Sequence, residues 1–286
     1  MSEAGRSNHQ RMHEGAVLAP LADRYARWLG MDAAQVLADR DEAAHDIRAM
    51  QLILRMERAT PPSWHRAVAL AAAGATALCL DERSAPGGEW HDAVAAYVRG
   101  HIRKVTRRAR GAHWAAAQEL PGLTLEADGT QVRVLVPGPV VGLDPRIGRL
   151  QVGGTDVPSD VPPDEPGAAS GALRLWIPEA LPMTVGKAMA QAGHAGMICA
   201  ALLARDDAPP ADRERLAGWR EAGFPVTVRR VDAAQWARLA QPVARDQDLA
   251  WRSEGRLAVR DAGFTEVEPG AITIIATRPD PSPRSS

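Results

Sequence analysis

The stretch Pro182–Met197, PMTVGKAMAQAGHAGM, runs from a short turn into an alanine-rich segment with helical spacing of its polar residues. At 3.6 residues per turn, Lys187, Gln191 and His194 share one face of a helix. Thr184 is the expected N-cap of that helix, which puts Lys187 in the first turn, where the helix dipole disfavours a cation. A lysine at that place favours a site for an anion or for negative charge that develops during a reaction.

A second face of the same helix is small and apolar. It consists of Ala188, Ala192, Ala195 and Cys199, and such a face lets a neighbouring element approach closely. Three polar residues on one helix face are more often a solvated surface than a site. The helix pattern alone therefore leaves both interpretations of the polar face open.

The composition is typical of a soluble globular protein of about two domains, with 286 residues, 45% of them hydrophobic and 24% charged. The 34 basic and 35 acidic residues give a net charge of -1, so any contact with nucleic acid must come from a local basic patch. Only Lys104 and Lys187 are lysines. A lysine is noteworthy in a chain that otherwise uses arginine for positive charge.

The two cysteines, Cys79 and Cys199, form neither a metal-binding spacing nor a disulfide framework, so we expect no metal and no cofactor. Their low number fits a reducing cytoplasm. The first residues lack an apolar signal core, and the longest largely apolar run, residues 67–80, is too short to span a membrane. We therefore expect a cytoplasmic protein without a membrane partner.

Composition shifts divide the chain into segments. The best linker candidate is 154–171, which has four prolines in eighteen residues and few side chains to bury. The expected segments are a tail with accessory helices over 1–49, a domain over 50–153, the linker over 154–171, a second domain over 172–278 and a disordered tail over 279–286.

Hydrophobic periodicity predicts the elements of both domains. Strands are expected over 50–56, 131–136, 173–177, 225–231, 256–260 and 271–277. Helices are expected over 64–80, 89–100, 213–222 and 233–239, around Trp114, and from Thr184 onward.

The order of these elements indicates an internal repeat. A shift of 121 residues superposes Leu52–Leu54 on Leu173–Arg174–Leu175. The same shift aligns Lys187, Gln191 and His194 with Arg66, Leu70 and Ala73. The first copy has thus lost most of the polar face, which favours a site in the second copy and a packing role for the first.

A second polar constellation lies near the C-terminus, in the stretch Arg260–Ile275, RDAGFTEVEPGAITII. Its pattern predicts a strand, a tight turn and a returning strand. Within it stand Asp261, Thr265 and Thr273. An isolated Asp-Ala-Gly is most often only a turn, so Asp261 alone does not decide between a turn and a site.

Together, Gly186-Lys187-x-x-x-Gln191-x-x-His194 and Asp261-Ala-Gly-x-Thr265 with Pro-Gly-x-x-Thr273 resemble the type 2 peptidyl-tRNA hydrolase family over about 172–279. The resemblance implies an α/β fold: a three-layer α/β/α sandwich around a four-stranded mixed sheet. With the repeat, that sandwich is expected twice in the chain, the first time as a degenerate copy. The family is commonly dimeric, so we expect either a homodimer or an intramolecular pseudo-dimer of the two halves.

The resemblance also implies a function, hydrolysis of the ester between a peptide and tRNA, with peptidyl-tRNA as partner. The catalytic residues it implies are Lys187, His194, Asp261 and Thr265, and the substrate-binding residues are Gly186, Gln191 and Thr273. Arg229 and Arg230 are added from the sequence as a basic pair that could contact phosphates.

The mechanism expected from these residues uses water as the nucleophile, because the second copy has no Gly-x-Ser-x-Gly motif. Asp261, with His194, would orient and deprotonate the water. Lys187 and the hydroxyl of Thr265 or Thr273 would stabilise the oxyanion or the departing ribose oxygen, and Gln191 would position the substrate. The alternative is an inactive or weakly active relative that binds RNA or protein. It is motivated by Val185 and Pro178, which stand where the family usually has charged residues.

Overall fold

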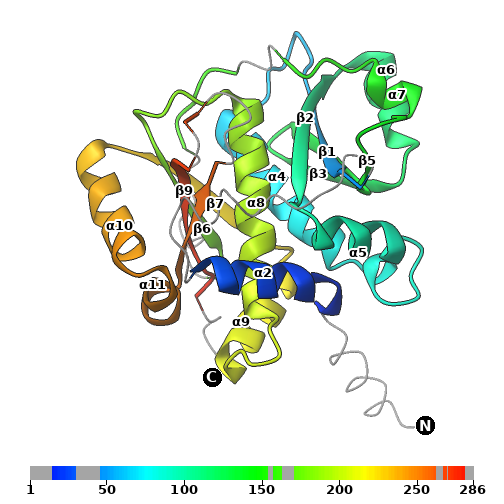
Figure 1. The fold of residues 1–286 in the computed structure, drawn as a ribbon. Helices are drawn as coiled ribbons and strands as arrows, with labels where there is room; N and C mark the ends of the chain where they lie inside the picture. The colour runs from blue at the N-terminus through cyan, green and yellow to red at the C-terminus, as the bar shows by residue number, and fades with distance from the viewer. Residues whose placement is uncertain are drawn as a thin grey trace.

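The structure is a computed structural model that describes residues 15–29, 46–153, 157–162, 171–261, 267–268 and 270–280. Its described elements form two sheets, one in each half of the chain, with helices on both faces of each sheet (Figure 1). We call the part up to residue 153 the first half and the part from residue 171 the second half.

The first half begins with a short 3-10 helix and ends with a single-turn helix. Its elements are η1 (Ala16–Leu18), α2 (Ala19–Leu29), β1 (Arg48–Arg55), α4 (Trp64–Cys79), η2 (Glu82–Ser84), α5 (His91–Arg99), β2 (Arg103–Ala109), α6 (Gly111–Gln118), β3 (Gly122–Ala127), β4 (Thr130–Leu135), β5 (Gly138–Pro139) and α7 (Pro145–Gly148).

The second half contains four strands and four helices among the described residues. They are β6 (Leu173–Pro178), α8 (Val185–Leu203), α9 (Pro210–Glu221), β7 (Val226–Val231), α10 (Ala233–Arg245), α11 (Gln247–Glu254), β8 (Arg256–Arg260) and β9 (Ile272–Thr277).

The two sheets have the same strand order. It is β2-β1-β4-β3 in the first half and β7-β6-β9-β8 in the second, and β5 pairs in addition with β1. In each sheet the first two strands are parallel and the other pairs are antiparallel. The predicted mixed four-stranded sheet is thus confirmed in the second half, and the first half has the same order of four strands with β5 as a fifth.

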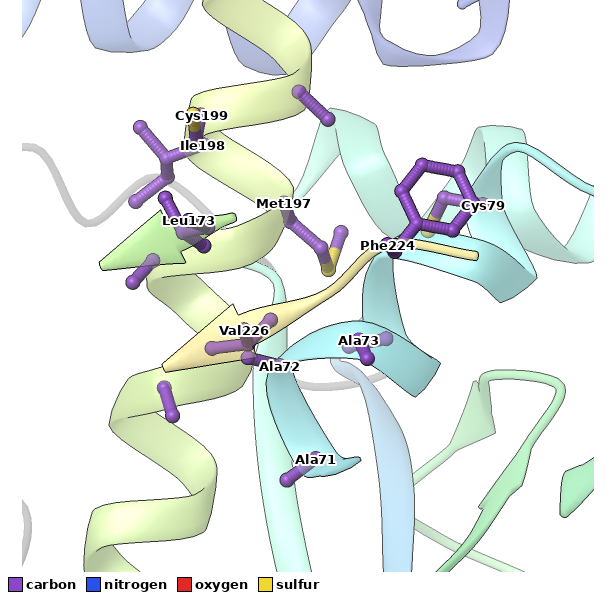
Figure 2. Close-up of a cluster of buried hydrophobic side chains, with 14 of the residues drawn as sticks. Ala71, Ala72, Ala73, Cys79, Leu173, Met197, Ile198, Cys199, Phe224 and Val226 are labelled. Carbon is purple, nitrogen blue, oxygen red and sulfur yellow. The ribbon is translucent and has the colours of Figure 1, made fainter. Parts of the chain in front are cut away.

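Each sheet is covered on both faces, as the prediction of an α/β/α sandwich requires. On the outer faces, α6 packs on the first sheet through Trp114 and Ala117, and α10 packs on the second through Leu239 and Val243. On the inner faces lie α4 and α8, which pack against each other. Because these two helices meet, the inner faces of both sheets share one hydrophobic core. Figure 2 shows the part of this core where α4 and α8 lie beside β6 and β7.

The contact between α4 and α8 is made by small residues. A Cβ atom added to Gly193 would lie 3.5 Å from Cβ of Ala75, and one added to Gly196 would lie 2.8 Å from the carbonyl oxygen of Ala72. The 121-residue shift aligns Ala72 with Gly193 and Ala75 with Gly196. The two contacts are therefore the same contact read from opposite sides, which is the relation that a two-fold axis produces.

The starts of α4 and α8 are also equivalent. The side chain of Ser63 accepts a hydrogen bond from the backbone N–H of Arg66 at 3.1 Å, and Thr184 accepts one from Lys187 at 3.2 Å. Such caps satisfy one of the N–H groups that a helix leaves unpaired at its start. The predicted N-cap at Thr184 is confirmed, and the pairing of Arg66 with Lys187 agrees with the repeat.

Some elements differ from the sequence expectations. Helix α10 continues past the expected end through Pro242, whose missing N–H costs one helix hydrogen bond. Burial of Leu239 and Val243 against the sheet holds the extra turns in place. Strand β3 and helices α7 and α11 were not expected individually, because their short segments carry little periodic signal.

Two segments outside the sheets also make tertiary contacts. The N-terminal helices contact both halves, and the proline-rich segment contacts the first half. Leu18 at the end of η1 and Leu21 in α2 are buried, and the hydroxyl of Tyr25 in α2 donates to the carbonyl of Ala258 in the second half. Within the proline-rich segment, Val157 is buried and the carboxylate of Asp160 bonds to His65. Among the described residues, no helix combines the length and the apolar character that spanning a bilayer requires.

Gly196→Ala should destabilise the protein, because the new methyl group would lie 2.5 Å from Oγ1 of Thr76 and 2.8 Å from a backbone oxygen of α4. Overpacking of this kind costs about 1–3 kcal/mol. The melting temperature should fall by several degrees. Gly148→Ala is the matched control, because no atom of the described residues lies within 4 Å of its added Cβ. Equal melting temperatures for the two variants would contradict the close helix contact.

Candidate active site

The polar face of α8 meets the end of β8 and the start of β9. Asp261 follows the last residue of β8, and Thr273 is the second residue of β9. Backbone hydrogen bonds tie the two strands together here: the N–H of Asp261 donates to Ala271 at 3.0 Å, and the N–H of Gly270 donates to Asp261 at 2.8 Å. Two sequence motifs that lie some seventy residues apart are thereby brought to one place.

The side chains at this place form one hydrogen-bonded group. Oδ1 of Asp261 accepts from Nζ of Lys187 and, at 3.0 Å, from Nε2 of Gln191. Oε1 of Gln191 in turn accepts from the hydroxyl of Thr273 at 2.9 Å. The Thr273 hydroxyl also lies 3.1 Å from the carbonyl oxygen of Val259. The chain of bonds fixes the amide orientation of Gln191 and the position of the carboxylate.

This group is largely withdrawn from solvent. The side chains of Lys187 and Asp261 are 10% and 4% exposed, and Gln191 and Thr273 are buried. Burying an ion pair costs the hydration free energy of both charges, and this cost is offset by their mutual attraction and by further hydrogen bonds. The second donor that Gln191 supplies to Asp261 does this, so the carboxylate is held in one geometry.

His194 lies one helical turn beyond Gln191 on the same face of α8 and is partly buried. Burial lowers the pKa of its imidazole well below 6.5, and the positive charges of Lys104 and Lys187 lower it further. The ring is therefore neutral at physiological pH. A neutral imidazole has an acceptor nitrogen, which an imidazolium lacks.

Lys104 belongs to β2 in the first half. Its stem passes so close to Gly193 that a Cβ there would lie 2.7 Å from Cε of the lysine, and its Nζ donates to Tyr97 at 3.2 Å and to Ile102 at 3.1 Å. Burial lowers its pKa from 10.5 to about 7. The only two lysines in the sequence thus both act on His194. In the sequence, the rarity of lysine was the one feature that pointed to Lys104 as a functional residue.

Three other expected residues have defined surroundings. The carbonyl oxygen of Gly186 accepts a hydrogen bond from Thr106 of β2 at 2.8 Å. Arg230 donates to the carbonyl of Glu179 at 2.9 Å and lies over the ring of Trp64, while Arg229 donates to its own neighbour's backbone. Arg230 therefore contacts the first half at the start of α4. Thr265, the remaining expected catalytic residue, lies outside the described residues.

The equivalent place in the first half has different chemistry. Arg66, which aligns with Lys187, forms an ion pair with Asp128, and Leu70 is buried. His65 is held by Asp160 of the proline-rich segment at 2.6 Å. The chain itself thus covers the start of α4.

Among the described residues, no group of three or more His, Cys, Asp or Glu side chains is placed to hold a metal ion. The arrangement offers a carboxylate, an ammonium, an amide and a neutral imidazole. A carboxylate beside a cation at a helix start can orient a water molecule and stabilise an anion. These four groups can supply acid–base and electrostatic chemistry.

The fold and this group of residues define the second half as an α/β domain with a polar site at the start of its central helix. Residues 173–284 match the family model described as "Peptidyl-tRNA hydrolase PTH2". The second half is thus a type 2 peptidyl-tRNA hydrolase domain, as the resemblance predicted. No curated protein matches the chain.

The lowered pKa of His194 predicts a pH-dependent stability. Between pH 6.5 and the lower folded-state pKa, the unfolded chain binds a proton that the folded chain does not bind, so stability falls as pH falls. One proton gives a slope of at most about 1.4 kcal/mol per pH unit. Between pH 7.5 and 5.5, the melting temperature of the wild type should therefore drop more than that of His194→Gln. An imidazole NMR signal of His194 that titrates at or above 6.5 would contradict this.

Proposed function

We propose that the second half hydrolyses the ester bond between a peptide and tRNA. The observation that carries this proposal is the single hydrogen-bonded group formed by Lys187, Gln191, Asp261 and Thr273 inside the segment that matches the hydrolase family. These residues come from α8, from the end of β8 and from β9. Their convergence supports a site more strongly than either motif does alone.

Water is the proposed nucleophile. The second half has one serine before its tail, Ser253, and its hydroxyl donates to the backbone of α11 at 2.6 Å. Asp261 accepts a proton from the attacking water as the water adds to the ester carbonyl. The tetrahedral intermediate then collapses, the bond to the ribose oxygen breaks, and that oxygen takes up a proton as it leaves.

Lys187 supplies the positive charge for this reaction. Its ammonium stands in the first turn of α8, where the backbone N–H groups also point toward the start of the helix. A negative charge that develops on the carbonyl or ribose oxygen is stabilised by both. In a site that excludes water, such fixed charges are worth far more than in solution.

Gln191 and Thr273 have positioning parts in this proposal. Thr273 is fully buried and its hydroxyl is engaged by Gln191, so it acts through the amide and not on substrate. Gln191 holds the carboxylate of Asp261 in place. His194, neutral at physiological pH, offers an acceptor nitrogen that orients the water or a ribose hydroxyl.

The first half serves in this proposal as an internal partner, so the chain is a pseudo-dimer of two related sandwiches. The support is the common strand order and the reciprocal contacts of Ala72 with Gly196 and of Ala75 with Gly193. We place the protein in the cytoplasm, where its two thiols, both buried and unbridged, would stay reduced.

A second candidate is an inactive relative that keeps the fold to bind RNA. The near-complete burial of the Lys187–Asp261 pair favours it, because a pair of this kind also serves structure alone. Val185, buried at the first position of α8, adds no charge at the helix start. Hydrolysis assays and RNA binding separate the two candidates.

Release of peptide from peptidyl-tRNA tests the proposal. Asp261→Asn should lower kcat/KM by roughly 10²–10⁴, the range for loss of a general base, and Lys187→Met by roughly 10²–10³. Arg252→Gln is the control, because its ion pair with Asp248 is exposed on α11. This control should retain activity within about twofold.

A wild-type protein that releases no peptide above background would remove the enzymatic proposal. If the same preparation still binds tRNA, with an affinity that falls steeply as salt rises, the RNA-binding candidate stands in its place. Circular dichroism at the assay temperature shows whether each variant is folded. This control is needed because breaking a buried ion pair also destabilises the fold.

A further inference from the structure

A hollow of about 350 Å³ lies in the first half, where the parallel strands β1 and β2 end. Its lining includes Arg108, Arg110, Arg149 and His113, with Ala109 and Leu150 from the outer hydrophobic core. In α/β folds, ligands commonly bind beyond the carboxyl ends of parallel strands. The hollow therefore has both the place and the positive charge of an anion site.

The three arginines of the hollow have no ion pair with a described residue. Arg108 donates to the neutral amide oxygen of Gln151 at 3.1 Å, and Arg149 donates to a backbone carbonyl, that of Pro145, at 2.8 Å. Most other arginines with a described side-chain partner meet a carboxylate, as Arg83 meets Asp81. The positive charge of the hollow is thus available to bind an anion.

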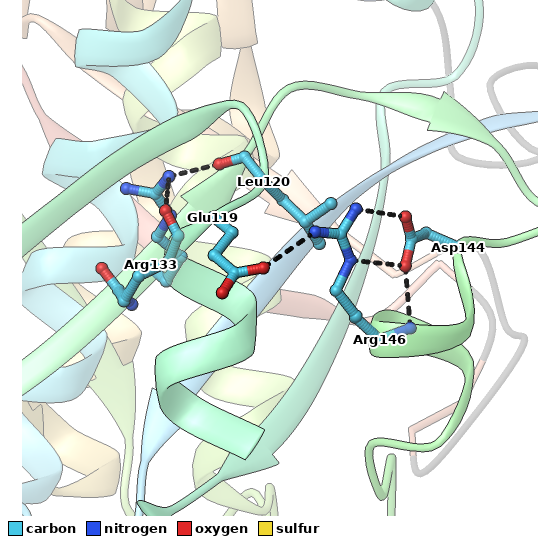
Figure 3. Close-up of polar contacts among 6 residues, drawn as sticks. Glu119, Leu120, Arg133, Asp144 and Arg146 are labelled. Atoms are coloured by element: carbon cyan, nitrogen blue, oxygen red, sulfur yellow. Dashed lines mark hydrogen bonds and ion pairs between the residues drawn. The ribbon is translucent and has the colours of Figure 1, made fainter. Parts of the chain in front are cut away.

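Two acidic residues close to these arginines are already engaged by other groups. Glu57, which lies near Arg110, accepts from Arg55 at 3.1 Å and from the N–H of Gly111 at 3.2 Å. Asp144, near Arg149, is held by two nitrogens of Arg146 at 2.7 and 3.0 Å (Figure 3). These bonds leave the hollow with a positive field.

The hollow lies on the side of the molecule where α8 begins. Along β2, Lys104 crosses Gly193 and Thr106 bonds to Gly186, so the strand runs toward the start of α8. Arg108 is two residues further, about 7 Å along the strand. An extended polyanion that reaches Lys187 would thus pass close to these arginines.

The net charges of the two halves indicate that RNA binding needs basic residues from the first half. Residues 172–286 contain 15 Lys and Arg against 14 Asp and Glu, a net of +1, whereas residues 50–153 contain 13 against 9, a net of +4. Affinity for nucleic acid comes mainly from neutralised phosphates. The hydrolase domain by itself has little charge for this purpose, and the first half has more.

We propose that Arg108, Arg110 and Arg149 bind a phosphodiester of the tRNA strand whose esterified 3′ end lies at Lys187 and Asp261. This inference rests on the proposed function for its ligand. Guanidinium groups bind phosphate oxygens through pairs of hydrogen bonds, so neutral substitutes cannot replace them. The first half then contributes directly to substrate binding.

Binding of a fluorescent RNA minihelix with a single-stranded 3′ end, measured by anisotropy from 50 to 300 mM NaCl, tests the inference. In Arg108→Gln/Arg110→Gln, Kd at low salt should rise about tenfold, and the slope of log K against log salt should shrink by about 1–2. The matched control is Arg238→Gln/Arg245→Gln, which removes the same charge from exposed positions on α10. An equal loss of affinity in both double variants would overturn the phosphate site.

Kinetics with peptidyl-tRNA separate this inference from the proposed function. The Arg108/Arg110 variant should raise KM and leave kcat within about twofold, because the arginines bind phosphate away from the reacting ester. If the wild type is inactive but the variant still weakens minihelix binding beyond the control, the hydrolase proposal fails and the RNA site stands. If the wild type is active and KM is unchanged in the variant, the RNA site is lost.

A titration with inorganic phosphate, followed by NMR of the arginine side chains, distinguishes RNA from a small anion. Weak, millimolar perturbation with tight minihelix binding is the expected result. Tight binding of free phosphate without minihelix binding would overturn the assignment to RNA. Equal melting temperatures of the two double variants ensure that the comparison reports binding.

Discussion

The close approach of α4 and α8 is the constraint on which the rest of the structure depends. Glycine and alanine at the crossing let the two backbones meet, and a bulkier residue at Gly196 would strike the backbone of α4. Because the helices meet, two sheets that would each need their own covering layer share one core. The same approach carries β2 across α8, which sets Lys104 and Thr106 beside the polar face of the second half.

Electrostatics at the polar face follow from that packing. Lys187 has a carboxylate partner in Asp261, while Lys104 has none among the described residues and donates to oxygens of Tyr97 and Ile102. Burial disfavours protonation of the His194 imidazole, and the nearby Lys104 and Lys187 disfavour it further, so His194 stays neutral. Lys104 of the first half thus adds to a pKa shift of His194 that burial mainly causes. The same sandwich without its neighbour would have a more basic histidine.

The sequence was sufficient for the features that local patterns encode. The cap at Thr184, the face shared by Lys187 and Gln191, and the strand that precedes Asp261 all follow from spacing, and the structure places them as expected. Lys104 could not be assigned to the site, because nothing in the spacing of β2 says which helix it crosses. The hydrogen bond between Asp160 and His65 could not be predicted either. The segment containing it has the composition of a linker, and only its tertiary contacts show that it packs on α4.

The bond from Asp160 to His65 has a consequence for how many substrates one molecule can hold. A dimer of identical sandwiches carries its polar helix start twice, and each of its surfaces must suit both halves. In this chain one helix start is covered by the chain itself, and the other retains the ammonium and carboxylate. Under the proposed function, one molecule with two sheets would hold one ligand. The surface around the start of α4 need not contact the reacting ester. It can therefore change in sequence and bind the part of a long ligand that lies away from the ester.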